Sequence, residues 1–287
     1  MALSDHSTQT VFFNGEYLPK SSVHLSPDDR GFLFGDGVYE VVRSYGGRFF
    51  ALAEHLERLH RGLCELRIPG VDAAEFGDIA CELLDRNGMA TDDAVVYMQV
   101  TRGAATRRHA FPLEQTPPTT YATAMPFQSK GDPAEGVKVI TLADTRWTRC
   151  DIKSVNLLPN CLANQRAQEA GAIEAIFIRD GVVLEATASS FLGLFDGIIR
   201  TAPKSNYILP SITRDVVLDL CRETGIEVLE MPILEHELMA AEELFLAGTT
   251  LEVMAIVEVN GRPVGDGRPG PMHRRLYDLF RRRVNPD

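Results

Sequence analysis

The chain has 287 residues, of which 45% are hydrophobic and 24% charged, and its formal net charge is −11. This composition is typical of a globular protein with one large domain or two ordinary ones, and it excludes a disordered chain. The acidic balance argues against a general affinity for nucleic acid or for anionic membrane surfaces. Any anionic ligand must therefore be held by a few local positive groups.

The five cysteines are odd in number and none are spaced as C-x-x-C, which argues against a disulfide framework and against a zinc or other metal site. They favour a reducing compartment. No apolar run approaches the length of a membrane span, and the first ten residues contain no apolar core of a secretion signal. We therefore expect a cytoplasmic protein without a membrane partner.

The first part of the chain predicts strands and two helices. Strands are indicated by β-branched and aromatic residues at 10–19, 35–50, 94–103 and 119–127. Helices are indicated by apolar residues three or four apart at 52–68 and 73–89. Asn14-Gly15 and Gly46-Gly47 supply turn residues inside the first two strand regions, so each of these regions is expected to be a pair of antiparallel strands.

A polar stretch rich in glycine and proline, QSKGDPAEG, separates these elements from the rest of the chain. Such a composition is typical of a domain boundary. We therefore divide the chain into a smaller N-terminal domain (1–128), an interdomain linker (129–136) and a larger C-terminal domain (137–287). The last of these contains Lys153.

The C-terminal part mixes strands and helices without a regular βαβ alternation. Strands are expected at 137–144, 174–186, 191–200, 227–233 and around Ile256 and Val259. Helices are expected at 160–171, 211–224, 236–243 and 271–284. Strands joined by hairpins and interspersed with helices place the protein in the α+β class.

Lys153 lies in the otherwise largely apolar stretch CDIKSVNLLPN. A lysine that is buried must give up its hydration or its proton, so its presence there requires an explanation. The side chain either extends its amine to water or serves as a nucleophile that forms a Schiff base. This stretch by itself leaves both interpretations open.

Two further segments carry groups suited to a phosphate. The helix expected from Ser211 begins with SIT, and a helix start combines unpaired N–H groups with the positive end of the helix dipole. Thr249 and Thr250 follow an expected strand and offer hydroxyl and amide donors, while Arg58 offers a positive charge. Each feature is also explained by an ordinary capped helix, a turn or a solvated face.

Glu185 lies at the end of the apolar run in GVVLEATASSF. It is either a strand-end carboxylate turned to water or the partner of a cationic ring nitrogen. Pyridoxal phosphate has three requirements: a lysine for a Schiff base, a carboxylate for the pyridinium nitrogen, and a helix start with an arginine for the phosphate.

Six segments, in order and at consistent spacing from about Phe12 to about Gly265, resemble those of a known family. They are RGFLFGDGVYEVVRSY, EHLERL, QVTRGAATRRHAFP, TRWTRCDIKSVNLL, LPSITRDVV and ELFLAGTTLEV. Together they resemble the fold-type IV pyridoxal-phosphate enzymes, and within these the bacterial D-amino acid aminotransferases. The resemblance implies a smaller, sandwich-like α/β N-terminal domain and a larger C-terminal domain in which helices flank a β pseudo-barrel.

The same resemblance assigns the cofactor, pyridoxal 5′-phosphate, to particular residues. Lys153 would form the Schiff base and then move a proton between the substrate Cα and the cofactor C4′. Glu185 would face the pyridine nitrogen, and Leu209 would pack against the ring. The phosphate would be held by Arg58, Ile212, Thr213 and Thr249.

The resemblance also implies a substrate pocket and a homodimer. The substrate contacts would be Tyr39, Val41, Arg43, Arg107, His109 and Thr250. Arg107 and His109 match a pair that reaches in from the neighbouring subunit and forms, with Tyr39, a trap for the substrate α-carboxylate. The expected reaction moves an amino group from a D-amino acid to a 2-oxo acid such as 2-oxoglutarate, in active sites shared between two subunits.

Some positions depart from the family pattern. Ala188 and Gly248 stand where Ser is frequent, and Ser190 stands where Asn is common. These departures concern the surroundings of the cofactor ring, so they put its tuning in question more than the reaction type. Arg108 adds a charge between the two trap residues whose effect the sequence does not define.

Four alternative functions use the same scaffold or the same cofactor. They are a branched-chain L-amino acid aminotransferase, an (R)-selective amine transaminase, aminodeoxychorismate lyase and a carrier that binds pyridoxal phosphate without catalysis. The Arg107–His109 pair argues against the first three, and retention of both Lys153 and Glu185 argues against the last.

Overall fold

The computed structural model describes residues 9–112, 116–129 and 131–285. The chain forms two compact units, each with its own hydrophobic core. Unit 1 comprises Met1–Phe127 with Ile152–Asn156, and unit 2 comprises Gln128–Asp151 with Leu157–Asp287. Lys153 therefore belongs to unit 1, whereas the sequence places it in the C-terminal domain. Within the expected linker, Lys130 lies outside the described residues.

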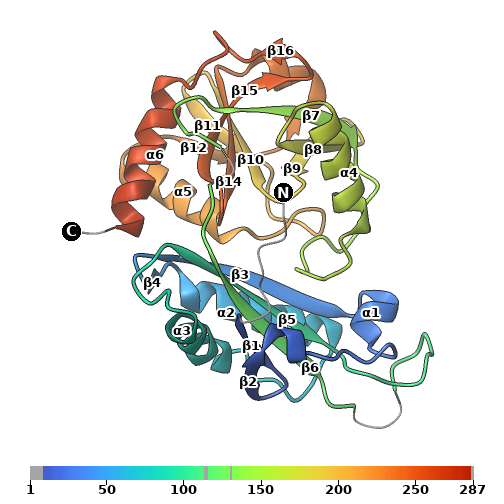
Figure 1. Ribbon diagram of the computed structural model, residues 1–287. Coiled ribbons are helices and arrows are strands. Elements are labelled where there is room, and N and C mark those ends of the chain that lie inside the picture. Colours follow the sequence, from blue (N-terminus) through green and yellow to red (C-terminus); the bar gives the residue numbers. More distant parts are fainter. Residues whose placement is uncertain (1–8, 113–115, 130, 286–287) are drawn as a thin grey trace. The chain divides into compact units, whose positions relative to one another are not determined.

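Unit 1 is an antiparallel six-stranded sheet with two long helices packed against it (Figure 1). Its elements are β1 (Thr10–Phe13), β2 (Glu16–Pro19), the 3-10 helix η1 (Lys20–Ser22), α1 (Arg30–Phe34), β3 (Gly37–Tyr45), β4 (Arg48–Phe49), α2 (Leu52–Leu66), α3 (Glu75–Arg86), β5 (Ala94–Thr101) and β6 (Thr119–Pro126). The strand order is β2-β1-β6-β5-β3-β4. Asn14 and Gly15 have φ values of 49° and 91°, so the predicted first hairpin is confirmed.

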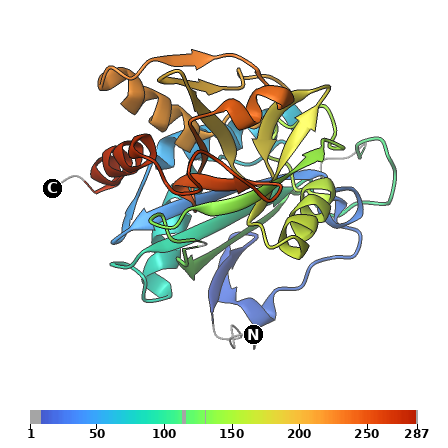
Figure 2. The ribbon, with the colours of Figure 1, turned by 90° about the horizontal axis from the view of Figure 1, so that it is seen from above.

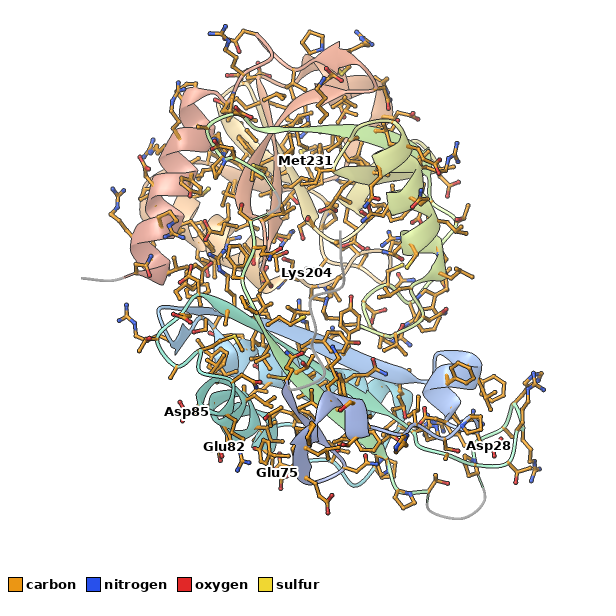
Figure 3. The ribbon with its side chains drawn as sticks, in the orientation of Figure 1. Asp28, Glu75, Glu82, Asp85, Lys204 and Met231 are labelled. Carbon is orange, nitrogen blue, oxygen red and sulfur yellow. The ribbon has the colours of Figure 1, made fainter. Side chains whose placement is uncertain are left out.

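Helices α2 and α3 are amphipathic, and their apolar faces form the core of unit 1 with the sheet. Leu59 and Leu63 of α2 are buried there, as the leucine spacing predicts. The side chains of Glu75, Glu82 and Asp85 lie on the outer side of α3 (Figure 3). The helices thus cover the sheet with leucines and present carboxylates to water.

A segment from much later in the chain, Ile152–Asn156, completes unit 1. Ser154 forms an antiparallel bridge with Val38 of β3, and the amide of Tyr39 donates to the carbonyl of Lys153 at 3.0 Å. This backbone pairing is the reason that Lys153 belongs to unit 1, and it fixes the lysine beside the start of β3.

Unit 2 contains a ten-stranded sheet in the order β12-β11-β10-β14-β15-β7-β8-β9-β13, with β16 paired to β15. Its elements are β7 (Val137–Ala143), α4 (Leu158–Glu169), β8 (Glu174–Arg179), β9 (Val182–Ala186), β10 (Ser190–Phe195), β11 (Ile198–Thr201), α5 (Ile212–Glu223), β12 (Val228–Glu230), β13 (Ile233–Leu234), the 3-10 helix η2 (Glu235–Ala240), β14 (Glu243–Gly248), β15 (Glu252–Val259), β16 (Arg262–Pro263) and α6 (Pro271–Val284). A further pairing of Glu185 in β9 with Ser190 in β10 closes the central strands into a barrel. The α+β class and the β pseudo-barrel are confirmed.

Three helices of unit 2 pack on its strands. Helix α4 lies against β7 and β8, and α5 and α6 lie side by side against β14 (Figures 1 and 2). None of the helices in the described ranges is long and apolar enough to cross a membrane.

Two short helical segments differ from the expectations. Residues 236–243, where a helix is expected, contain most of the 3-10 helix η2 and the start of β14. Strands on both sides leave eight residues, of which six form η2, and such short segments often take the tighter 3-10 form. Helix α1 was not indicated by periodicity. It begins because Asp29 accepts a hydrogen bond from the amide of Gly31 at 2.8 Å, and it ends at Gly35, whose φ is 67°.

Candidate active site

The amine of Lys153 lies next to aromatic side chains of β3 and β5. Its Nζ is 4.3 Å from the centroid of the Tyr39 ring, and Tyr39 stacks on Tyr97 with a centroid distance of 5.7 Å. Burial raises the pKa of Tyr97 above its usual value. Lys153 itself is half-buried. The structure thus brings Lys153 and Tyr39 together, as the site prediction requires.

Glu40 follows Tyr39 in β3 and is completely buried. Its carboxylate accepts hydrogen bonds from Nε and Nη2 of Arg58, at 2.6 and 2.9 Å, and lies 2.8 Å from Nδ1 of His55. Burial by itself would raise the pKa of Glu40, but Arg58 and His55 outweigh it and lower the pKa to about 2. Glu40 is therefore a fixed negative charge that orients Arg58.

The pKa of His55 lies below its usual value in this arrangement. Burial lowers its pKa and Glu40 opposes this effect, while the charges of Arg58 and Lys153 lower the pKa further. Tyr39, whose ring lies against the Lys153 amine, directly precedes Glu40, the partner of Arg58, in β3. Unit 1 thus holds Lys153, Tyr39 and Arg58 in one neighbourhood.

In unit 2 the central residue of the candidate site is Glu185, whose exposed fraction is 6%. Its Oε1 accepts a hydrogen bond from Nη1 of Arg146, and its Oε2 accepts one from the amide of Leu209 at 3.0 Å. Arg146 is also bound by Asp144 at 2.9 and 3.1 Å and lies over the ring of Phe177. Burial would lower the pKa of Arg146, but Asp144 and Glu185 raise it above its usual value. This cation holds Glu185 as a carboxylate, which has the acceptor capacity for a further N–H group.

The predicted phosphate residues Ile212 and Thr213 begin α5, shortly after Leu209. Ser211 caps the helix by accepting a hydrogen bond from the amide of Arg214 at 3.2 Å. The amides of Ile212 and Thr213 belong to the first turn, where an α-helix has no internal acceptors for its N–H groups. Unit 2 therefore links a buried carboxylate on β9, through the amide of Leu209, to the segment that begins α5.

Thr249 and Thr250 form the turn between β14 and β15. A Cβ atom added at Gly248 would lie 3.4 Å from Oγ of Ser189, so the turn touches the loop between β9 and β10. The side chain of Glu174 binds that loop through Oγ of Ser189 and the amide of Ala188, at 2.6 and 2.8 Å.

The positions that depart from the family pattern therefore lie together. Ser190 pairs with Glu185, Ala188 is held by Glu174, and Gly248 packs close to the same loop. Glycine at position 248 suits this arrangement, because the backbone there lies close to the loop that contains Ser189.

Arg107 and His109 lie in the loop after β5, and both are exposed. They gather around the ring of Phe34: the Arg107 guanidinium is 5.3 Å from its centroid, and the His109 ring meets it edge-on at 5.8 Å. The two residues are thus brought together, and their exposure leaves them accessible to a second chain.

The remaining predicted contacts on β3 differ in their surroundings. Val41 is half-buried. Arg43 is buried, bonds to Asp93 at 3.2 Å, and lies 3.4 Å from the ring centroid of Phe127 and 4.1 Å from that of Tyr45. This placement of the guanidinium favours a structural role for Arg43 over the predicted substrate contact.

Sequence reasoning missed the charged residues that hold the site residues in place. Glu40 lies on the same face of β3 as Val38 and Val42. A carboxylate on such an apolar strand face requires a cation, so the local sequence did indicate a buried ion pair here. The sequence around Arg146 gave no such indication, because its partner Glu185 is 39 residues away. In the described part of the chain, no group of three His, Cys, Asp or Glu side chains is placed to hold a metal ion.

The groups present in each unit fit a part of pyridoxal phosphate. Unit 1 supplies an amine beside an aromatic ring together with an oriented arginine, Arg58, and unit 2 supplies the buried carboxylate of Glu185 and the start of α5. These are the groups required for the carbonyl, the phosphate and the ring nitrogen of that cofactor.

Comparison with known proteins gives matches over most of the chain. Residues 37–259 match the family Amino-transferase class IV. The chain is 42% identical to a D-alanine aminotransferase of Bacillus licheniformis over 275 residues, 96% of each protein. It is 38% identical to a D-alanine aminotransferase of Staphylococcus haemolyticus over 276 residues, which cover 96% of this chain and 97% of the relative. A crystal structure of the T.th. branched-chain amino acid aminotransferase with pyridoxamine 5′-phosphate is similar, with a TM-score of 0.87 and 27% identity over 96% of this chain and 94% of that chain.

We expect Glu40→Gln to lower the free energy of unfolding by about 3–5 kcal/mol, because it leaves the Arg58 charge buried without its partner. Glu82→Gln is a matched control: its ion pair with Arg86 has the same 2.6 Å distance from Nε to Oε1, but both side chains are more than 40% exposed. Exposed pairs contribute ~0–1 kcal/mol. Chemical denaturation of the cofactor-free protein measures both changes, and equal effects would show that burial does not set the strength of the Glu40 pair.

Proposed function

The chain belongs to the class IV aminotransferases, and from this premise we propose that it transfers the amino group of a D-amino acid to a 2-oxo acid, with pyridoxal 5′-phosphate as its cofactor. The similarity to D-alanine aminotransferases, which extends over nearly the whole length of both proteins, is the observation that carries the substrate class. The branched-chain aminotransferase structure shares the fold at 27% identity, against 42% for a D-alanine aminotransferase. The D-amino acid assignment is therefore favoured over the branched-chain alternative.

In this proposal unit 1 provides the covalent anchor. The Lys153 amine would bind the cofactor carbonyl, and it would move a proton between the substrate Cα and the cofactor C4′. The ring of Tyr39 lies against this amine, and Arg58, oriented by Glu40, contributes a phosphate contact. When bound, pyridoxal phosphate supplies the electron sink for the electron pair released at Cα.

Unit 2 provides the ring and phosphate contacts. Glu185, whose two oxygens are fixed by Arg146 and the amide of Leu209, would hold the pyridine nitrogen protonated. The Leu209 side chain would pack on the ring, and Ile212, Thr213 and Thr249 would complete the phosphate contacts.

The substrate α-carboxylate is bound by Tyr39, Arg107 and His109, with Val41 and Thr250 as further substrate contacts. A carboxylate that leaves water is stable only where donors replace its hydration, and a guanidinium, an imidazole and a phenol supply them. We assign Arg107 and His109 to the site of a neighbouring subunit, because both are exposed in a single chain. The active form is then a homodimer. The five cysteines are all free thiols, which fits a cytoplasmic enzyme.

We expect Lys153→Ala to abolish the visible absorption of the protein-bound cofactor, because no other lysine is assigned to the cofactor. Borohydride reduction of the wild-type protein, followed by peptide mapping, should place the reduced cofactor on Lys153. Lys138→Ala is the control, since Lys138 is an exposed partner of Glu258 and should leave the spectrum unchanged. A label on one of the other four lysines would contradict the assignment.

Glu185→Gln should retain the cofactor through its other contacts but slow the first half-reaction by about ten- to a hundredfold, because a neutral amide holds a protonated nitrogen less well. Single-turnover absorbance measurements with D-alanine report this rate. Glu235→Gln, at an exposed carboxylate of the same unit, is the control. Unchanged single-turnover rates would remove Glu185 from its proposed role.

Arg107→Ala should lower kcat/KM for D-alanine by at least about tenfold relative to the value for (R)-1-phenylethylamine, which has no carboxylate. Arg108→Ala changes the neighbouring exposed charge and should leave the ratio of the two values unchanged. If the loop were only a solvated basic segment, both variants would show the same small change in salt dependence.

Subunit mixing tests whether the site is shared. A heterodimer of Lys153→Ala and Arg107→Ala has one site in which both groups are intact, so the mixture should recover part of the D-alanine activity. Absence of recovery after verified subunit exchange would contradict the shared site.

A further inference from the structure

We propose that Arg30, supported by the ring of Phe34, is a positioning residue for the substrate-carboxylate trap. It holds the backbone of the loop that carries Arg107 and His109. This inference rests on the proposed function for the role of those two residues, but its structural part concerns unit 1 alone.

The Arg30 guanidinium faces three successive carbonyl groups of the loop. Its Nη1 donates to Arg108 O at 2.6 Å and to Ala110 O at 3.4 Å, and its Nη2 donates to His109 O at 3.4 Å. Arg30 has an exposed fraction of only 3%, whereas the three loop residues are exposed. A buried cation therefore fixes the backbone of an otherwise exposed segment.

The ring of Phe34 positions the two trap side chains. The guanidinium of Arg107 and the ring of His109 lie 5.3 and 5.8 Å from its centroid, and the guanidinium of Arg30 lies 4.7 Å from the same centroid. Arg30 and Phe34 are the first and last residues of α1. One short helix thus contacts both the backbone of the loop and its functional side chains.

Asp36 fixes Arg30 in turn. Its carboxylate accepts from Nε of Arg30 and from Nε of Arg102, both at 2.8 Å. Arg102 also donates to the carbonyls of Leu66 and Arg67 at the end of α2. Burial would raise the pKa of Asp36, but the hydrogen bonds from Arg102 and Arg30 outweigh it and lower the pKa. Asp36 therefore stays ionised and links the trap loop, α2 and the start of β3.

Backbone hydrogen bonds add to this attachment. The amide of Arg30 donates to Gly103 O at 2.9 Å, and the amide of Ala105 donates to Asp28 O at 3.2 Å. Figure 3 shows Asp28 at the end of unit 1 that carries this loop. Since its guanidinium is already bound by a carboxylate and three carbonyls, Arg30 acts on a substrate through the loop and not by direct contact.

The variant Arg30→Lys isolates this function. A lysine keeps a positive charge near Asp36 but lacks the planar fork that reaches several carbonyls at once. We expect KM for D-alanine to rise by about tenfold with kcat within about twofold of the wild-type value, because a displaced trap weakens carboxylate binding. Cofactor affinity, measured by spectroscopic titration, should be unchanged, whereas a general structural defect would lower it.

A second measurement needs neither cofactor nor substrate. Trypsin cleaves after Arg108, whose carbonyl is the closest partner of Arg30 in the loop. Cleavage requires the loop to leave its bound conformation, so Arg30→Lys should accelerate it by about tenfold in the cofactor-free protein. Mass spectrometry of the fragments separates this site from the others.

Arg200→Lys is the matched control. Arg200 also pairs with a carboxylate, Glu237, donates to the carbonyl of Pro232 and lies 4.7 Å from a phenylalanine ring centroid, but it belongs to unit 2. It should change neither KM nor the cleavage after Arg108. If Arg30→Lys does not fold, Phe34→Leu leaves the Arg30 side chain in place and removes the ring, and KM should rise by about threefold or more at constant kcat.

Equal cleavage rates in wild type and Arg30→Lys, or a lower kcat with an unchanged KM, would overturn the proposal. For Phe34→Leu, an unchanged KM would do the same. Failure of the proposed function gives a different result: the wild-type enzyme would not use D-alanine at all. In that case the trypsin measurement still tests whether Arg30 holds the loop.

Discussion

The ion pair of Glu40 and Arg58 is the interaction on which the lysine-bearing unit depends. A carboxylate with no exposed surface is stable as an anion only if a cation is held against it, and Arg58 meets this condition with two short hydrogen bonds. The pair joins β3 to α2 at the level of Tyr39, where the Lys153 segment also pairs with β3. Strand, helix and lysine therefore form one rigid neighbourhood.

The same constraint recurs at the other functional elements. Glu185 is held by Arg146, and Asp36 is held by Arg30 and Arg102. In each case an arginine binds the carboxylate and also a backbone carbonyl or an aromatic ring, a combination that suits the planar guanidinium because it presents five N–H donors in a fixed fork. Arginines outnumber lysines by 24 to five in this chain.

The elements that were predicted correctly depend on short-range patterns. The hairpin at Asn14-Gly15, the leucine face of α2 and the Ser211 cap of α5 each involve residues within a few positions of one another. The helix expected at 236–243 is the shorter 3-10 helix η2, because neighbouring strands, and not its own residues, limit its length. The proximity of Lys153 to Tyr39 was implied only by family resemblance, since no local pattern relates residues so far apart.

The sequence by itself determined the α+β class, most helices and strands, the family and the residues expected to bind the cofactor, because these follow from periodicity and from motifs in a fixed order. Only the tertiary structure decided which charges pair. Glu40 meets Arg58 across 18 residues, Arg146 meets Glu185 across 39, and Arg30 meets the carbonyl of Arg108 across 78. The chain contains many carboxylates and many arginines. The type of a residue does not indicate which of these distant groups will be its partner in the folded protein. Burial makes each of these pairings obligatory, and the backbone topology selects the partner.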